Sequence, residues 1–172
     1  MNTIVMAEPV EAQKNTGIGR RSPNVSSITA SLHRVLAYEN EAVIVRIAHE
    51  EKITKPEAEV IFKDTLRFLW LGHQAKMAIC PTKQIDAGWH IFLLFTQDYR
   101  EFCQAFFGEF IDHHPRRPED EPDGGAMARK SRALAEEILV GHAGVTLSGN
   151  WEYPLAATGD CCGNCGSDCC KR

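Results

Sequence analysis

The chain has 172 residues, 44% of them hydrophobic, which is enough for one domain with a core and short for two. Its 23 acidic and 19 basic residues give a formal charge of −4, without the basic surplus that nucleic-acid binding usually requires. These values favour a single domain and argue against nonspecific DNA binding.

The N-terminal sequence has no basic segment followed by an apolar one, so it shows no secretory signal. The longest apolar run, residues 91–95, is far shorter than the roughly 18 residues that span a bilayer. We therefore expect a cytoplasmic protein with no membrane segment. Because thiols stay reduced in that compartment, clustered cysteines indicate metal binding or redox chemistry better than structural disulfides.

The apolar pattern predicts a mainly α-helical fold, a single compact bundle of about five helices. Residues 1–27 lack apolar periodicity, and we expect a disordered, flexible arm there. The helical domain is expected over residues 28–141, and an irregular cysteine-rich tail over residues 142–172.

The expected helices follow from apolar spacing and from start and stop residues. Thr54, Pro56 and Glu57 form a good helix start, Thr82 can cap the next helix, and Gly108 is a plausible stop. The predicted ranges are 27–38, 41–51, 54–76, 83–95 and 96–108, where the last helix starts at Thr96 or Asp98. Apolar residues on the long third of these segments, Val60 among them, should face the core.

After a charged Pro/Gly-rich loop over residues 115–125, a final helix is expected to end at Gly141. One face of it should pack on the bundle. That face carries Met127, Ser131, Leu134 and Ile138.

Asp86 and His90 lie four residues apart, which places them on one helix face, one turn from each other. Because the surrounding residues are apolar nearly all round the helix, both side chains are candidates for burial, and buried polar groups need partners. His113 and His114, in the segment that follows the next helix, are the candidate partners.

One carboxylate and two imidazoles around an open coordination position are what a hydrolytic zinc or a non-haem iron site uses. This chemistry would support metal-bound water as a nucleophile or oxygen activation. The alternative is a hydrogen-bonded network in which Asp86 accepts from an imidazole and His113 closes the loop. Cys103 could add a sulfur ligand, although a lone cysteine among aromatics also fits a small buried hydrophobe.

The C-terminal sequence GDCCGNCGSDCCKR carries five closely spaced cysteines. They are Cys161, Cys162, Cys165, Cys169 and Cys170. Such thiolates could hold zinc, copper(I) or an iron–sulfur cluster, and a CxxC pair could equally act as a dithiol couple. A sulfur-rich end without defined chemistry is the third alternative.

Several spaced motifs occur together: Asp86-Ala87-Gly88-Trp89-His90, then Tyr99 and Cys103, then Phe110-Ile111-Asp112-His113-His114-Pro115. Over about residues 40–115 this set resembles the glycine-rich domain-containing protein family of plants and bacteria. The helical domain of that family carries an Asp-x-x-Trp-His motif, a Tyr, a Cys and a late His-Pro segment. The resemblance implies a helical domain of undefined biochemistry, with an RNA-related role suggested for some plant members. This chain lacks their long glycine-rich C-terminal region, so no RNA role is expected here.

Two functions remain open from the sequence. The first is a metal-binding helical protein that uses zinc, iron or copper, with an Asp/His cluster in the domain and a thiolate cluster in the tail. The second is a noncatalytic module for protein interaction or redox sensing, in which the Trp-His motif is structural and the tail contacts a protein partner. Oligomeric state, substrate and reaction stay open.

Overall fold

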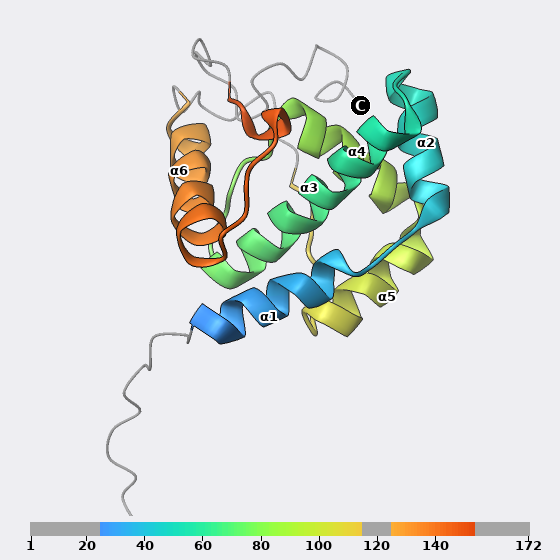
Figure 1. Cartoon of the computed structure of the whole chain (residues 1–172). Coiled ribbons are helices and arrows are strands. Elements are labelled where there is room, and N and C mark those ends of the chain that lie inside the picture. The colour runs from blue at the N-terminus through green and yellow to red at the C-terminus, as the bar shows by residue number, and fades with distance from the viewer. Residues whose placement is uncertain (1–24, 115–124, 154–172) are drawn as a thin grey trace, which may run out of the picture.

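The computed structural model describes residues 25–114 and 125–153. Over these residues the chain forms six α-helices and no strand, which confirms the expected helical bundle (Figure 1). The helices are α1 (Val25–Leu36), α2 (Glu41–Glu51), α3 (Lys55–Ala75), α4 (Lys83–Leu94), α5 (Thr96–Phe106) and α6 (Ala126–Ala135). Most of the N-terminal segment expected to be flexible lies outside the described residues. No helix in the described ranges is both long enough and apolar enough to cross a membrane.

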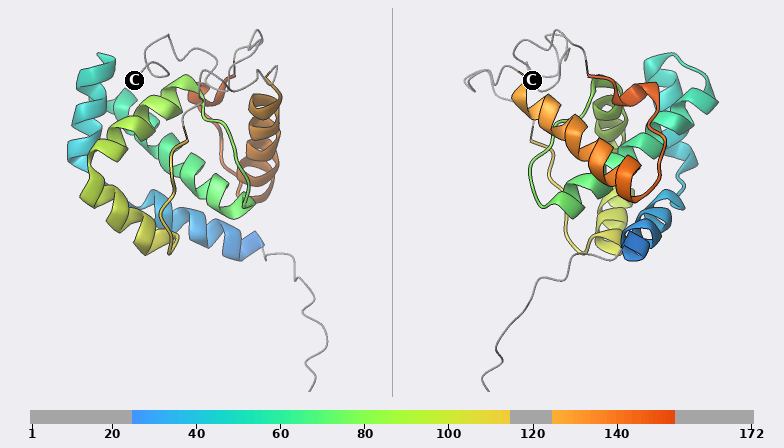
Figure 2. Two further views of the ribbon diagram at one scale, coloured as in Figure 1. Left: turned by 180° about the vertical axis from the view of Figure 1, so that it is seen from behind. Right: turned by 60° about the vertical axis from the view of Figure 1, so that its left-hand side comes forward.

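The long helix α3 crosses the centre of the molecule, and the other helices lie around it (Figures 1 and 2). Ten of its residues are buried, so it forms the main part of the core. Phe62, for example, is fully buried and packs edge-on against Phe92 of α4, with ring centroids 5.3 Å apart. The expectation that Val60 faces the core is wrong, because 44% of its surface is exposed on the outer side of the helix.

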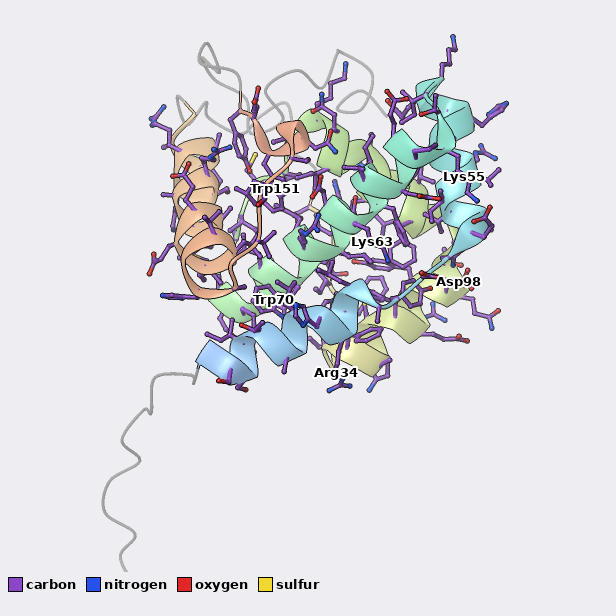
Figure 3. All side chains as sticks on the ribbon, viewed as in Figure 1. Arg34, Lys55, Lys63, Trp70, Asp98 and Trp151 are labelled. Carbon is purple, nitrogen blue, oxygen red and sulfur yellow. The ribbon has the colours of Figure 1, made fainter. Side chains whose placement is uncertain are left out.

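Helix α1 is attached to α3 by polar contacts as well as by packing. The indole N–H of Trp70 donates to the Ser31 hydroxyl at 2.7 Å. Lys63 donates from Nζ to the carbonyl oxygens of Leu36 at 2.7 Å and Tyr38 at 3.0 Å, where α1 ends. Figure 3 marks both side chains of α3. The two Lys63 bonds provide partners for backbone carbonyl groups at and just after the end of α1, where a helix end leaves carbonyls without intrahelical partners.

The predicted helix starts and stop are confirmed. Glu57 accepts hydrogen bonds from the backbone N–H and the hydroxyl of Thr54, which lowers the pKa of its carboxyl group. The Thr82 hydroxyl accepts from the backbone N–H of Ile85 at the start of α4. Gly108, with φ of 73°, takes the left-handed conformation that glycine favours after a helix end.

Helices α3 and α4 approach each other most closely at Gly88. A Cβ atom on Gly88 would lie only 2.9 Å from Cγ2 of Ile61 and would overlap the hydroxyl oxygen of Thr65. The Thr65 hydroxyl bonds to the Ile61 carbonyl at 3.0 Å and also lies 3.3 Å from the carbonyl oxygen of Ile85 on α4. Only glycine leaves room for this contact.

The final helix packs with a face shifted from the predicted one. The fully buried side chains are Ala128, Ser131, Ala135 and Leu139, whereas Met127, Leu134 and Ile138 are half-buried at the flanks. Two physical reasons apply. Small alanines allow a close approach, and residues Glu136–His142 form a wider π-helical segment that displaces the later side chains.

The residues after this helix were expected to be irregular, yet they pack on the bundle. The segment returns along α3 and ends in a 3₁₀ turn, Gly149–Trp151, near the start of α4 (Figures 1 and 2). Trp151 is fully buried in the core. The Thr82 hydroxyl, which caps α4, also donates to the carbonyl of Asn150 at 2.5 Å.

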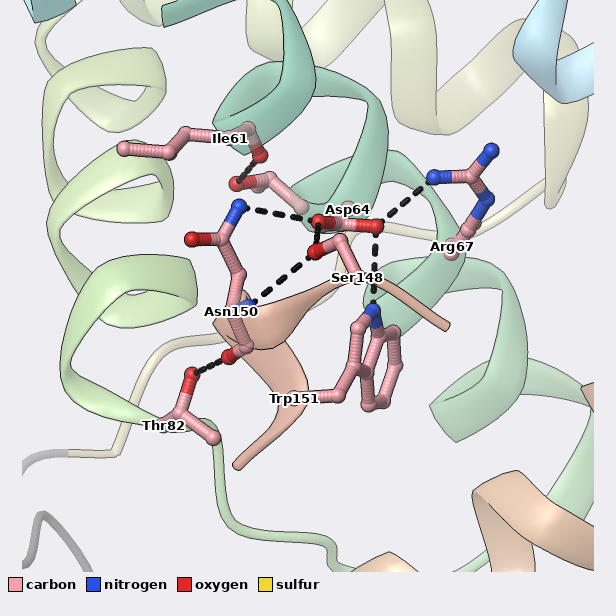
Figure 4. Close-up of polar contacts among 8 residues, drawn as sticks. Ile61, Asp64, Arg67, Thr82, Ser148, Asn150 and Trp151 are labelled. Atoms are coloured by element: carbon pink, nitrogen blue, oxygen red, sulfur yellow. Dashed lines mark hydrogen bonds and ion pairs between the residues drawn. The ribbon is translucent and has the colours of Figure 1, made fainter. Parts of the chain in front are cut away.

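A buried carboxylate on α3 holds this segment in place (Figure 4). Asp64 is fully buried and accepts from Arg67 at 2.7 Å on its own helix. It also accepts from the hydroxyl of Ser148 at 2.6 Å, the amide of Asn150 at 3.0 Å and the indole of Trp151 at 3.0 Å. We call these five residues the Asp64 clamp.

Candidate functional site

Helix α4 places Asp86 and His90 one turn apart, as the spacing predicts. The Asp86 side chain is buried, with 5% of its surface exposed, whereas 41% of the His90 side chain is exposed. Nδ1 of His90 lies 3.5 Å from a carboxylate oxygen of Asp86. The pair therefore joins a buried anion to a solvent-accessible imidazole.

His113 approaches the same carboxylate from the segment after α5. Its Nε2 lies 2.9 Å from the other carboxylate oxygen of Asp86, and only 12% of its side chain is exposed. Its ring lies 4.4 Å, centroid to centroid, from the rings of both Trp89 and His90. Asp86 is thus placed between two imidazoles that come from different segments of the chain.

A buried tyrosine connects this segment to α4. The hydroxyl of Tyr99 donates to the carbonyl of Ile111 at 2.7 Å and accepts from the indole N–H of Trp89 at 3.0 Å. Phe110 packs edge-on against the Tyr99 ring, with centroids 5.2 Å apart. Burial raises the pKa of Tyr99, so its hydroxyl keeps its proton at neutral pH.

The three side chains have the geometry of a candidate metal site. One ligand atom each from Asp86, His90 and His113 lie within 4.8 Å of one another. Ligand atoms about 2.1 Å from one ion are themselves about 3.0–3.5 Å apart, which is close to the separations from Asp86. We call these three residues the Asp86 cluster.

The protonation state of His90 suits this chemistry. Burial lowers the pKa of His90, a shift that the nearby Asp86 carboxylate opposes and His113 reinforces. The neutral imidazole, which is the form that binds metals, is therefore favoured at neutral pH. His90 is also the most exposed member, so it is the side of the cluster that meets the solvent.

The structure does not bring every predicted ligand to this place. His114 is exposed and lies outside the cluster. Cys103 is buried beside Tyr99 and the Ile111 backbone, outside the three-residue group, and burial raises the pKa of its thiol. The predicted thiolate ligands Cys161, Cys162, Cys165, Cys169 and Cys170 lie outside the described residues.

Two polar arrangements were not expected from the sequence. The link from Trp89 through Tyr99 to the Ile111 backbone was not predicted, although buried indole and phenol groups signal a need for partners. The Asp64 clamp had no signal beyond one acidic residue among apolar neighbours on a core helix. Three of the four donors to Asp64 follow 84–87 residues later in the chain.

Comparison with known proteins found no match among the curated proteins or the solved structures. One family does match, the family described as UCP032817-like, over residues 33–124, which is just over half of the chain. The matched range includes α2 to α5 and all three residues of the Asp86 cluster.

This match corrects the resemblance to the glycine-rich domain-containing protein family, which is wrong. The motif residues behind that resemblance largely serve packing and hydrogen bonding here, because Trp89, Tyr99 and Cys103 are buried in the core. Such spacing of aromatic residues is expected wherever helices of a bundle meet. The chain belongs to the UCP032817-like family.

Proposed function

We propose that this chain is a metal-binding protein whose Asp86 cluster holds one divalent transition-metal ion. The observation that supports the proposal is the convergence of a buried carboxylate and two imidazoles from separate segments within 4.8 Å. A buried carboxylate that faces two imidazoles is stabilised when a cation lies between them.

The donor set favours zinc or iron(II). Imidazole nitrogen and carboxylate oxygen suit both ions, whereas copper(I) prefers thiolates and would fit the C-terminal cysteines better. Three protein ligands leave coordination positions for water or a small molecule. Such a centre supplies either an activated water for hydrolysis or a place for oxygen to bind, so a metal-dependent hydrolase or oxygenase is the enzyme class that fits.

One observation favours a second candidate function. The 2.9 Å contact between His113 and Asp86 is by itself a hydrogen bond that closes the segment after α5. In this alternative the Asp86 cluster is structural, and the chain is a noncatalytic module whose cysteines sense redox state or contact a protein partner.

The experiment is elemental analysis of protein purified without oxygen and without a metal-binding tag. The variants are Asp86→Asn, His90→Ala and a chain truncated before Asp160, with His49→Ala as the control. His49 lies on α2 with 81% of its side chain exposed, outside the cluster. We expect about one zinc or iron per chain in wild type and His49→Ala, and loss of that ion in Asp86→Asn and His90→Ala.

The other outcomes are equally informative. Metal that disappears only on truncation would assign binding to the cysteine tail and contradict a site at the Asp86 cluster. A complete absence of metal from all folded variants, even after incubation with zinc or iron(II), would favour the noncatalytic alternative.

A further inference from the structure

We propose that Tyr99 is the positioning residue of the Asp86 cluster, because its hydroxyl holds the segment after α5 where His113 can reach Asp86. The metal-binding part of this inference rests on the proposed function. The positioning part stands on the hydrogen bonds of the described residues alone.

The directions of these hydrogen bonds follow from the chemistry of the groups. The indole nitrogen of Trp89 carries a proton and can only donate, so the Tyr99 oxygen accepts from it at 3.0 Å. The single hydroxyl proton of Tyr99 is then free to bond the carbonyl of Ile111, 2.7 Å away. Tyr99 is 1% exposed, so water cannot easily replace it in either bond.

The position of His113 depends on such side-chain contacts because regular structure ends earlier. Helix α5 finishes at Phe106, and residues 109–114 belong to no helix or strand. The Ile111 carbonyl lies only two residues before His113, so fixing it restricts where the imidazole can point. Asp86 and Trp89 share α4, so the same helix supplies the carboxylate and the anchor.

The result is a closed ring of contacts. It runs from Asp86 along α4 to Trp89, through Tyr99 to Ile111, along the backbone to His113, and back to Asp86. A ring of this kind orders a metal ligand before the ion arrives, which reduces the entropy lost on binding. Without the Tyr99 hydroxyl, the ring of contacts would be open between Trp89 and Ile111, and the segment would keep only its packing on the core and the His113 contacts.

The test compares Tyr99→Phe with Tyr38→Phe. Both remove one hydroxyl from a tyrosine that packs among phenylalanines, but the Tyr38 hydroxyl accepts from Asn40 and touches no member of the ring of contacts. The thermal unfolding curves of the two variants are used to choose a temperature at which both variants are folded. Two measurements then follow there.

The first measurement needs no metal. In metal-free protein, the NMR chemical shifts of the His113 ring protons should differ from those of an exposed histidine, because the Trp89 and His90 rings lie close by. Backbone amide protons near Ile111 should exchange slowly with solvent. We expect Tyr99→Phe to move the ring protons toward the shifts of an exposed histidine and to speed exchange there. Tyr38→Phe should change neither.

The second measurement is titration with cobalt(II), whose visible absorption reports on coordination. We expect Tyr99→Phe to weaken cobalt affinity about tenfold and to alter the spectrum, as loss of outer contacts around metal ligands usually does. Tyr38→Phe should retain both within about twofold.

Several results would overturn the inference. Unchanged His113 ring shifts and amide exchange in folded Tyr99→Phe would show that the hydroxyl does not position His113. If that variant does not fold, the solvent exchange rate of the Tyr99 hydroxyl proton is measured in wild type instead. A rate as fast as that of a free tyrosine would contradict the hydrogen bond to Ile111. If wild type binds no cobalt, the proposed function fails while the first measurement still tests the positioning role.

Discussion

At the scale of single residues, Asp64 is a charged side chain buried in a mainly apolar core. Its carboxylate is fully buried and depends on donors from Arg67, Ser148, Asn150 and Trp151. A buried anion is tolerated only where donors replace the water it has lost, and removing one partner of such a pair is costly. The Asp64 clamp therefore makes residues 148–151 part of the core.

A double-mutant cycle tests the clamp. Asp64→Asn should lower the free energy of unfolding by about 3 kcal/mol, because it removes a charge that four donors surround. Trp151→Phe keeps an aromatic ring but loses the indole donor, and should lower it by about 2 kcal/mol. In urea unfolding we expect a coupling of about 1–2 kcal/mol between them, since a hydrogen bond to a charge joins the two residues.

The matched control is Asp112→Asn, at an exposed aspartate, which should change stability by less than about 0.5 kcal/mol. Strictly additive effects of Asp64→Asn and Trp151→Phe would contradict a direct bond between these side chains.

The residue scale also shows what spacing can predict. Asp86 and His90 were placed together because a helix brings residues four apart onto one face, and local geometry is enough for that inference. His113 could be named only as a candidate, because its approach to Asp86 depends on how the segment after α5 folds back. Asp64 gave no specific signal, because three of its four donors are 84–87 residues away.

At the scale of helices, the contact at Gly88 sets how closely α3 and α4 pack. Gly88 lies between Asp86 and His90 in the sequence, so the same close approach places the Asp86 cluster relative to the core. The Thr65 hydroxyl and the Ile61 side chain occupy the space that a larger residue would need.

Gly88→Ala should therefore destabilise the protein, although alanine favours helices. We expect a loss of about 1–3 kcal/mol, the usual cost of overpacking a core. Gly72→Ala on α3 is the control, because its new Cβ would meet only the flexible end of Ile79 at 3.3 Å. That change should stay within about 1 kcal/mol of wild type in thermal unfolding. Equal stability of both variants would contradict a tight α3–α4 contact.

Helix boundaries were predicted well wherever a local chemical group sets them. Thr54 and Thr82 cap the next helices and Gly108 follows the end of α5, and these signals need only a few neighbouring residues. The packing face of the final helix was predicted only in part: Ser131 is buried, and Leu134 and Ile138 pack against the core, but these large apolar side chains stay half-buried. Packing instead buries the small Ala128 and Ala135, a choice that depends on the distance to the rest of the bundle.

At the scale of the whole molecule, the fold class could be predicted because helical periodicity repeats along most of the chain. The return of residues 143–153 to α3 and α4 could not, since this stretch contains no long periodic pattern. Its place depends on one buried tryptophan and on hydrogen bonds to distant residues.

Two shortened chains test how much the bundle depends on this return. A chain that ends at residue 147 loses all three C-terminal donors to Asp64, whereas one that ends at Tyr153 keeps them and the Tyr153 bond to the Cys80 carbonyl. We expect the shorter chain to lose cooperative thermal unfolding and the longer one to keep it. Similar cooperative transitions in calorimetry would contradict a structural role for residues 148–153.

The sequence distance across the Asp64 clamp also has a consequence for the order of folding. Ribosomes make the chain from its N-terminus, so α3 and α4 exist before Ser148, Asn150 and Trp151 are available to donate hydrogen bonds to Asp64. Until then the carboxylate is most stable in water, which disfavours closure of the α3 core around it. Contacts so far apart in sequence form slowly. The core around Asp64 would thus close only after residues 148–151 have packed against it. The Thr82 hydroxyl would join that late step to the start of α4, because it caps α4 and bonds the Asn150 carbonyl.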